Sequence, residues 1–170
     1  MKRPHRIIGT MTLLLLAIGV VAAQAEPQFT GAWVLDRSQS QLPAHQHRGH
    51  DAQVDPAEVK LVVAQQGTAL KVTRTMTMGT REHSMTDSYV ADGTDQTRQS
   101  YRGNVVTRAA FDGDRLVITR TRTKKGDQSE ATRSQESIWT LSPDGNVLTI
   151  DTTLHGSRGD RTMKTVYVRS

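Results

Sequence analysis

The chain has no cysteine and few aromatic residues: its 170 residues include 2 Trp, 3 Tyr and 2 Phe. Without cysteine there is no disulfide and no lipid anchor on a thiol, so stability depends on packing and strand pairing. Familiar catalytic signatures are missing as well, including a Gly-x-Ser-x-Gly elbow, a His-Glu-x-x-His pair and a glycine-rich phosphate loop. We therefore predict that the protein is not an enzyme and carries no cofactor.

The amino terminus has the three parts of an export signal. A basic start that includes Arg6 precedes an apolar stretch at 11–23, and Ala23-Gln24-Ala25 is a small-x-small cleavage site. The apolar stretch is shorter than the roughly 20 residues that cross a bilayer. We predict a signal peptide over 1–25, cleavage between Ala25 and Glu26, and a periplasmic or extracellular protein without a transmembrane segment.

Removal of this leader changes the charge balance of the predicted mature domain, residues 26–170. The leader holds three of the 22 basic residues and none of the 17 acidic ones, which leaves 19 against 17 and a formal charge of +2. Nucleic-acid binding needs Lys and Arg concentrated against phosphates. A surface this nearly neutral predicts no nucleic-acid partner.

Valine- and threonine-rich runs with period two dominate the mature domain, and this pattern is typical of half-buried strands. Turn signals such as Asp112-Gly113 and Asp92-Gly93 separate the runs, because these pairs tolerate the positive φ of tight hairpins. Neighbouring runs are therefore expected to pair antiparallel. We predict ten strands, at 31–36, 57–66, 69–77, 82–91, 95–101, 104–111, 115–123, 131–141, 146–154 and 161–169.

Ten strands in a meander need a closed arrangement, since an open sheet leaves two exposed edges and one uncovered face. The pattern favours an all-β, antiparallel up-and-down β-barrel, and a two-sheet sandwich is the competing arrangement. One long stretch, 37–56, lacks periodicity. A stretch of this kind is either a lid over a cavity or a solvated loop.

The sequence FTGAW places Gly31-x-Trp33 at the start of the first strand. This resembles lipocalins and the related up-and-down barrels that include fatty-acid-binding proteins. The longer pattern GAWVLDRSQSQLP, followed by the VKLVVAQQGTALKVT hairpin, looks closest to small secreted bacterial lipocalin-like proteins. The resemblance implies that Trp33 lies at the closed end of the barrel with a late arginine packed across it. Arg169 is the first candidate for that arginine and Arg161 is the other.

Residue parity predicts what the barrel interior contains, because alternate side chains of a strand point to opposite faces. One face of the strand at 69–77 begins with Leu and Val and continues to Arg74 and Met76. One face of the strand at 115–123 begins with Leu and Ile and ends in Arg120 and Arg122. An interior that is apolar at one end and polar at the other suits an amphipathic ligand. The predicted ligand-binding residues are Arg74, Met76, Met85, Asp87, Tyr89, Arg120, Arg122 and Glu136. Under the alternative interpretation, the charged groups lie solvated at the rim and the methionines only fill the core.

Three histidines lie close together in the aperiodic stretch: His45, His47 and His50. Neutral imidazoles bind zinc, copper or nickel, so this cluster is a candidate metal site. The simpler interpretation is a solvated polar loop, because a flexible segment loses conformational entropy when it gathers around an ion.

The function that these features predict is binding of a small apolar or amphipathic molecule inside the barrel of an exported, monomeric or weakly associating protein. The alternative is an envelope protein whose barrel is solidly packed and whose surface contacts another macromolecule. Metal binding through the histidine cluster is a further alternative. The sequence favours the first, because seven aromatic residues leave space inside a barrel.

Overall fold

The computed structural model describes residues 26–42, 58–100, 103–124, 133–156 and 159–170. Their order and periodicity give an all-β chain, as the sequence predicts. The ten strands are β1 (Gly31–Gln41), β2 (Glu58–Gln66), β3 (Ala69–Met78), β4 (Arg81–Val90), β5 (Asp92–Ser100), β6 (Gly103–Asp112), β7 (Arg115–Lys124), β8 (Arg133–Leu141), β9 (Val147–His155) and β10 (Arg161–Arg169).

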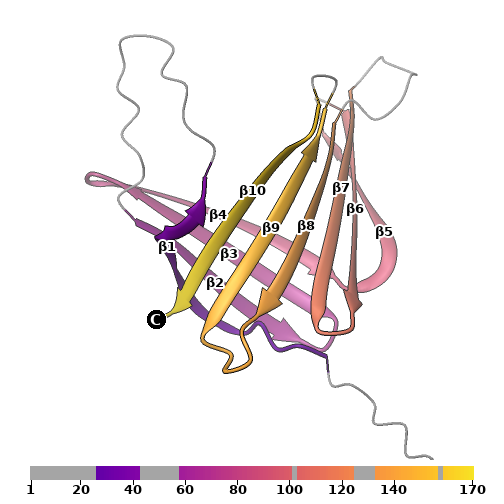
Figure 1. Ribbon diagram of the computed structural model, residues 1–170. Helices are drawn as coiled ribbons and strands as arrows, with labels where there is room; N and C mark the ends of the chain where they lie inside the picture. Colours follow the sequence, from indigo (N-terminus) through magenta and orange to yellow (C-terminus); the bar gives the residue numbers. More distant parts are fainter. Residues whose placement is uncertain (1–25, 43–57, 101–102, 125–132, 157–158) are drawn as a thin grey trace, which may run out of the picture.

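The strands form one antiparallel sheet in the order β4-β3-β2-β1-β10-β9-β8-β7-β6-β5 (Figure 1). Pairing of the first strand with the last curls the sheet into an up-and-down barrel, which confirms the predicted fold and excludes a two-sheet sandwich. The barrel is nearly closed rather than fully closed, because β4 and β5 end the sheet and have no ladder with each other.

The open seam between β4 and β5 corrects one detail of the sequence analysis. Asp92-Gly93 is not a hairpin turn: β5 begins at Asp92, and its pairing with β6 shifts register between Asp92 and Asp95. The Asp92 carboxylate accepts hydrogen bonds from the backbone amide and hydroxyl of Thr94 at 2.9 and 2.7 Å. A local bulge therefore takes the place of the expected turn, and the two strands diverge.

Two other turns behave as the sequence predicts. Gly67 and Gly113 have φ values of 55° and 60°, in the left-handed region that a residue without Cβ adopts at least cost. They join β2 to β3 and β6 to β7 with short connections. These tight turns set the register in which inward-facing residues of neighbouring strands meet.

Strand β1 is longer than predicted, because it continues through Arg37 to Gln41. At Asp36 the strand changes register against β10, and the Asp36 carboxylate accepts a hydrogen bond from the backbone amide of Ser38 at 2.9 Å. This local hydrogen bond stabilises the change of register, and the polar residues that follow remain part of the strand. The predicted aperiodic stretch therefore starts later than residue 37, and residues 43–57 lie outside the described part.

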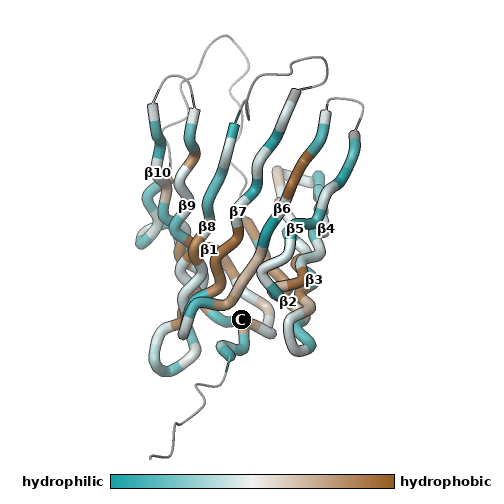
Figure 2. Tube along the Cα trace, turned by 90° about the vertical axis from the view of Figure 1, so that its right-hand side faces the viewer, coloured by the Kyte–Doolittle hydropathy of each residue, from teal (hydrophilic) through white to brown (hydrophobic). Residues whose placement is uncertain are grey.

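The core lies inside the barrel and is concentrated toward one end. Figure 2 shows hydrophobic segments mainly in the half nearer the carboxyl terminus, and hydrophilic ends on most strands at the opposite end. Within the described residues, no helix is long and apolar enough to span a membrane. The largest fully buried side chains are Trp33, Phe29, Leu61, Leu70, Leu116, Leu148 and Val63.

Candidate ligand cavity

The closed end of the barrel is organised around Trp33, whose side chain is fully buried. Its indole Nε1–H donates to the backbone carbonyl of Phe29 at 3.1 Å, and Phe29 meets Trp139 edge to face with 5.9 Å between ring centroids. The Arg169 guanidinium lies over the Trp33 ring, 4.3 Å from its centroid. Arg169 is therefore the arginine that packs across the tryptophan, and Arg161 lies at the other end of β10.

The same guanidinium joins three chain segments. Arg169 donates from Nη1 to the carbonyl of Thr30 at 3.0 Å and from Nε to the carbonyl of Gly145 at 3.1 Å. Gly31 leaves room for it, because a Cβ at that position would collide with Arg169 Nη1. The Gly-x-Trp pattern thus combines a buried indole with a glycine that lets a cation approach.

We expect Gly31→Ala to lower the free energy of unfolding by about 1 to 2 kcal/mol, because displaced Arg169 loses its cation–π contact and its hydrogen bonds. The measurement is urea unfolding followed by circular dichroism. The same substitution in an Arg169→Met background should cost clearly less, because the guanidinium is already gone. Equal costs in the two backgrounds would show that Gly31 acts independently of Arg169.

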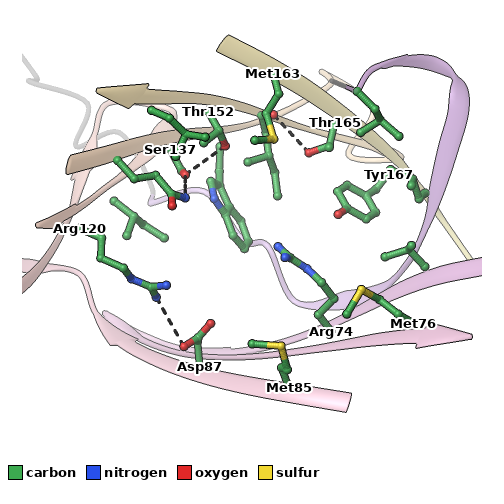
Figure 3. Close-up of a pocket in the computed structure, with 18 of the residues that line it drawn as sticks. Arg74, Met76, Met85, Asp87, Arg120, Ser137, Thr152, Met163, Thr165 and Tyr167 are labelled. Carbon is green, nitrogen blue, oxygen red and sulfur yellow. Dashed lines mark hydrogen bonds and ion pairs between the residues drawn. The ribbon is translucent and has the colours of Figure 1, made fainter. Parts of the chain in front are cut away.

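A cavity of about 700 Å³ occupies the barrel interior beyond this closed end. Its walls come from eight strands, all except β5 and β6. Figure 3 shows charged, sulfur-containing and hydroxyl side chains from opposite walls facing a common space. The volume falls within the range of about 300 to 1,000 Å³ that is usual for small-molecule sites. The lining residues are Leu35, Arg37, Leu42, Val59, Arg74, Met76, Met85, Asp87, Tyr89, Ile118, Arg120, Gln135, Ser137, Trp139, Ile150, Thr152, Leu154, Met163, Thr165 and Tyr167.

The cavity changes from apolar to charged along its wall strands. On β3, Leu70 and Val72 are buried, and Arg74 follows on the same face. On β7, buried Ile118 precedes Arg120. This gradient is the one that residue parity predicts for these two strands, and it places apolar groups deepest, where water is excluded.

One arginine of the cavity is already paired. Arg120 Nη2 donates to the Tyr89 hydroxyl at 3.1 Å and forms an ion pair with Asp87 Oδ1 at 3.5 Å. The side chains of Arg120 and Asp87 are 32% and 42% exposed, so solvent weakens their attraction. The pair neutralises the only carboxylate among the lining residues.

Arg74 has a different environment. Figure 3 shows its side chain extending from β3 into the cavity, with the ion pair of Arg120 and Asp87 beside it. Within the described residues, its guanidinium has neither a hydrogen bond nor an ion pair. The lining holds Arg37, Arg74 and Arg120 against one aspartate, a formal charge of +2. An anionic group entering the cavity therefore meets the guanidinium of Arg74, which has no partner among the described residues.

The Tyr89 side chain is buried, and its hydroxyl accepts the hydrogen bond from Arg120. Burial raises the pKa of its phenol, the positive charge of Arg120 opposes this, and the negative charge of Asp87 adds to it. A folded pKa above the unfolded value means that the stabilising contribution of Tyr89 is complete below pH of about 10 and is lost as pH rises through the folded pKa.

We therefore expect Tyr89→Phe to reduce the alkaline loss of stability. Measured as the free energy of unfolding at pH of about 9 and about 11, the wild-type protein should lose more stability than the variant, which lacks the phenolic proton. Lysine titration is common to both proteins, so the difference isolates Tyr89. An identical pH dependence would contradict the assigned environment of this side chain.

The wall opposite Arg74 is built from β8, β9 and β10, and its lining residues combine apolar side chains with uncharged polar groups. Ser137 Oγ and Thr152 Oγ1 are hydrogen-bonded at 3.1 Å, Gln135 Nε2 donates to Ser137 Oγ at 3.1 Å, and Thr165 Oγ1 donates to the carbonyl of Ile150 at 3.3 Å. In the described part of the chain, no buried side-chain polar atom lacks a partner. These hydroxyls are satisfied by one another and require no ligand.

Two of the predicted ligand-binding residues do not line the cavity. Glu136 lies on the opposite face of β8 from the lining residues Ser137 and Trp139, which corrects the parity assumed for that strand. Trp139 is 4% exposed, and burial of its large indole is strongly favourable. The alternate residues counted from Trp139 therefore face the barrel interior. Arg122 follows Arg120 on the same face of β7 but is exposed and outside the lining.

The other predicted positions are distributed as follows. Arg74, Met76, Met85, Asp87, Tyr89 and Arg120 all line the cavity. The histidines at 45, 47 and 50 lie outside the described residues, as does the predicted signal peptide. Sequence reasoning missed the β8–β10 wall, including Ser137, Thr152 and Tyr167. The inward-facing residues of β8 can be identified by counting every second residue from Trp139. The residues of β9 and β10 that pair with them then face inward too.

Comparisons with known proteins identify the fold. No protein-family model matches the chain, and no curated protein matches it. Among solved structures, human cRBP IV is similar with 15% identity and a TM-score of 0.56, over 84% of this chain and 98% of that one. The zebrafish ileal bile acid-binding protein complexed with cholic acid has 16% identity and a TM-score of 0.54, over 84% and 98%.

A fatty acid-binding protein from brain tissue of Drosophila melanogaster is also similar, with 18% identity and a TM-score of 0.52, over 83% of this chain and 99% of that one. None of these three is described as an enzyme. The identities are low, so the likeness establishes the fold alone. The chain has the nearly closed, ten-stranded, calycin-type barrel of fatty-acid-binding proteins.

Proposed function

We propose that the protein binds a small amphipathic molecule inside the barrel. Its apolar body lies against the apolar residues of the cavity lining, and its anionic head binds Arg74. One observation carries this proposal: a cavity of about 700 Å³ holds a guanidinium without a partner among the described residues. An arginine fork binds carboxylate, phosphate or sulfate through charge-assisted hydrogen bonds, which are stronger than neutral ones.

The rest of the cavity supports an amphipathic ligand rather than a wholly polar one. Ile118, Ile150, Trp139 and Leu154 provide apolar surface, and burial of ligand carbon against such surface stabilises a complex by about 25 cal/mol per Å². Two of the similar structures are described as binding proteins for fatty acids and bile acids. A cavity of this size argues against the alternative of a solidly packed barrel.

We also propose that the protein acts outside the cytoplasm after removal of residues 1–25. The support is the basic start, the apolar stretch at 11–23 and the Ala-Gln-Ala site. Amino-terminal sequencing of the protein recovered from the exporting cell should read from Glu26. A chain that still begins at Met1 would contradict export through this leader.

A matched set of three probes tests the proposed ligand class. A fluorescent fatty acid, its methyl ester and the corresponding primary amine share one apolar body and differ in head-group charge. We expect one molecule of the acid to bind per protein, about tenfold or more tighter than the ester, because only the acid pairs with Arg74. The amine should bind most weakly.

Fluorescence titration with native mass spectrometry gives both affinity and stoichiometry. Absence of uptake of all three probes would contradict a ligand-binding cavity. Equal affinities for acid, ester and amine would contradict the anionic head but retain an apolar ligand. The two outcomes therefore separate the cavity from the role of its charge.

A further inference from the structure

Two hydroxyl side chains form a polar pair within largely apolar surroundings on the cavity wall. Ser137 and Thr152, each 7% exposed, are the only buried polar side chains in the described part of the chain. They pair directly across β8 and β9, and both line the cavity (Figure 3). The lining residues that neighbour the Ser137–Thr152 pair along and across the strands are mostly apolar: Ile118, Trp139, Ile150, Leu154 and Met163.

The hydrogen bonds of the Ser137–Thr152 pair leave one hydroxyl proton without an acceptor. Gln135 Nε2 donates to Ser137 Oγ at 3.1 Å. A second bond, also 3.1 Å long, joins Ser137 Oγ to Thr152 Oγ1, and either hydroxyl can be its donor. Whichever of the two donates, the other hydroxyl keeps a proton for which the described residues supply no acceptor. Each oxygen therefore has a partner, but the pair still has one donor to spare.

We infer that the ligand carries, besides its anionic head, an uncharged oxygen part-way along its apolar body, and that this oxygen accepts a hydrogen bond from the Ser137–Thr152 pair. The inference rests on the proposed function, since it concerns the same bound molecule. It narrows the ligand class to oxygenated amphiphiles such as keto or hydroxy fatty acids. Arg74 extends from the opposite wall, so the head group and the oxygen bind on different sides of the cavity (Figure 3).

The energetic reason is the cost of covering a hydroxyl proton with hydrocarbon. A buried donor that loses access to any acceptor is penalised, whereas a neutral hydrogen bond that replaces one to water gives a modest net gain. An unsubstituted alkyl chain against the Ser137–Thr152 pair creates the first situation, and a keto or hydroxyl oxygen creates the second. A site that hydrogen-bonds a polar group therefore discriminates strongly against analogues that lack this group.

Another hydroxyl of the same wall provides an internal comparison. Thr165 also lines the cavity, but its Oγ1 donates to the carbonyl of Ile150 at 3.3 Å, so its single proton is already used. A ligand oxygen near Thr165 gains no donor from this side chain. Thr165→Val is therefore the matched control for replacement of the Ser137–Thr152 pair.

The test measures how well unlabelled fatty acids displace the fluorescent fatty acid from the cavity. The set comprises octadecanoic acid and its isomers with one keto group at successive positions along the chain. We expect one narrow range of positions to bind about tenfold tighter than octadecanoic acid, because there the keto oxygen meets the free proton. At the other positions the keto group is buried without a donor and should weaken binding.

A Ser137→Ala, Thr152→Val double variant removes both hydroxyls with little change in shape, and it should abolish the preference for the keto group. Its affinity for octadecanoic acid should stay within about threefold of the wild-type value or increase, because the alkyl chain then covers no free proton. Thr165→Val should retain the full preference. Circular dichroism checks that each variant is folded.

Two results would overturn the inference and leave the proposed function intact. In the first, octadecanoic acid binds and no keto isomer binds more tightly. In the second, the preference for the keto group persists in the folded double variant. Failure of octadecanoic acid and all its keto isomers to displace the probe would contradict the proposed function itself, and the inference would fail with it.

Discussion

Trp33→Ala is expected to lower the free energy of unfolding by about 3 to 5 kcal/mol, because it removes a fully buried indole and leaves a cavity at the closed end. The substitution also removes the donor to the Phe29 carbonyl and the ring beneath Arg169. The first and last strands, β1 and β10, pair with each other at this position. They then lose side-chain contacts that help to keep the barrel closed.

Urea unfolding followed by circular dichroism measures this effect, with two controls. Trp33→Phe keeps most of the apolar volume and should cost about 1 to 2 kcal/mol less than alanine does. Val62→Ala changes a side chain that is 50% exposed on the outside and should stay within about 0.5 kcal/mol. A Trp33→Ala effect as small as that of Val62→Ala would contradict the closed end described above.

Arg74→Glu is expected to weaken binding of a fluorescent fatty acid more than about 100-fold, because it exchanges charge-assisted hydrogen bonds for repulsion between two carboxylates. The lining charge falls from +2 to zero. Arg74→Gln removes only the attraction and should weaken binding about 10- to 100-fold. Affinity for the methyl ester should change far less in both variants, since the apolar wall is untouched.

Arg122→Gln is the control for this series. Arg122 lies on the same face of β7 as Arg120 but outside the cavity lining, so its loss should change fatty-acid affinity less than about threefold. Fluorescence titration gives all four values, and circular dichroism checks that each variant is folded. Equal losses in Arg74→Gln and Arg122→Gln would indicate general attraction by surface charge instead of a specific head-group site.

Much of this fold is predictable from the sequence, because period-two patterns and glycine turns are local signals. The run at 69–77 differs from β3 by one residue, and Gly67 and Gly113 adopt the positive φ expected of them. The all-β barrel follows from the number of strands and the cost of exposed edges. Pairing of β1 with β10 is a long-range contact, and the Gly-x-Trp resemblance is what pointed to it.

The open seam and the inner face of β8 were not predictable in the same way. Asp92-Gly93 has the composition of a hairpin turn, and only the register against β6 shows that it forms a bulge. In β8, Ile138 and Trp139 are adjacent apolar residues, so alternation alone fits either face. Contacts made by register decide the matter, since Trp139 pairs with Leu116 and Ile150 in the core.

The candidate site likewise has one part that the sequence predicts and one part that only the folded structure shows. Side chains on β3, β4 and β7 were predictable because their faces change from apolar to charged along one strand. The uncommitted state of Arg74 was not, because it depends on Asp87 pairing with Arg120 across the barrel. Charge balance inside a cavity is a property of the folded arrangement and not of any single strand.

Nuclear Overhauser effects between a bound fatty acid and methyl-labelled protein report directly whether the proposed anionic amphiphile lies inside the barrel. We predict contacts from the ligand chain to the methyl groups of Ile118 and Ile150, which line the cavity, and none to Val62 or Val168, which are exposed. Contacts confined to Val62 and Val168 would show that the fatty acid binds on the outer surface and would contradict binding inside the barrel.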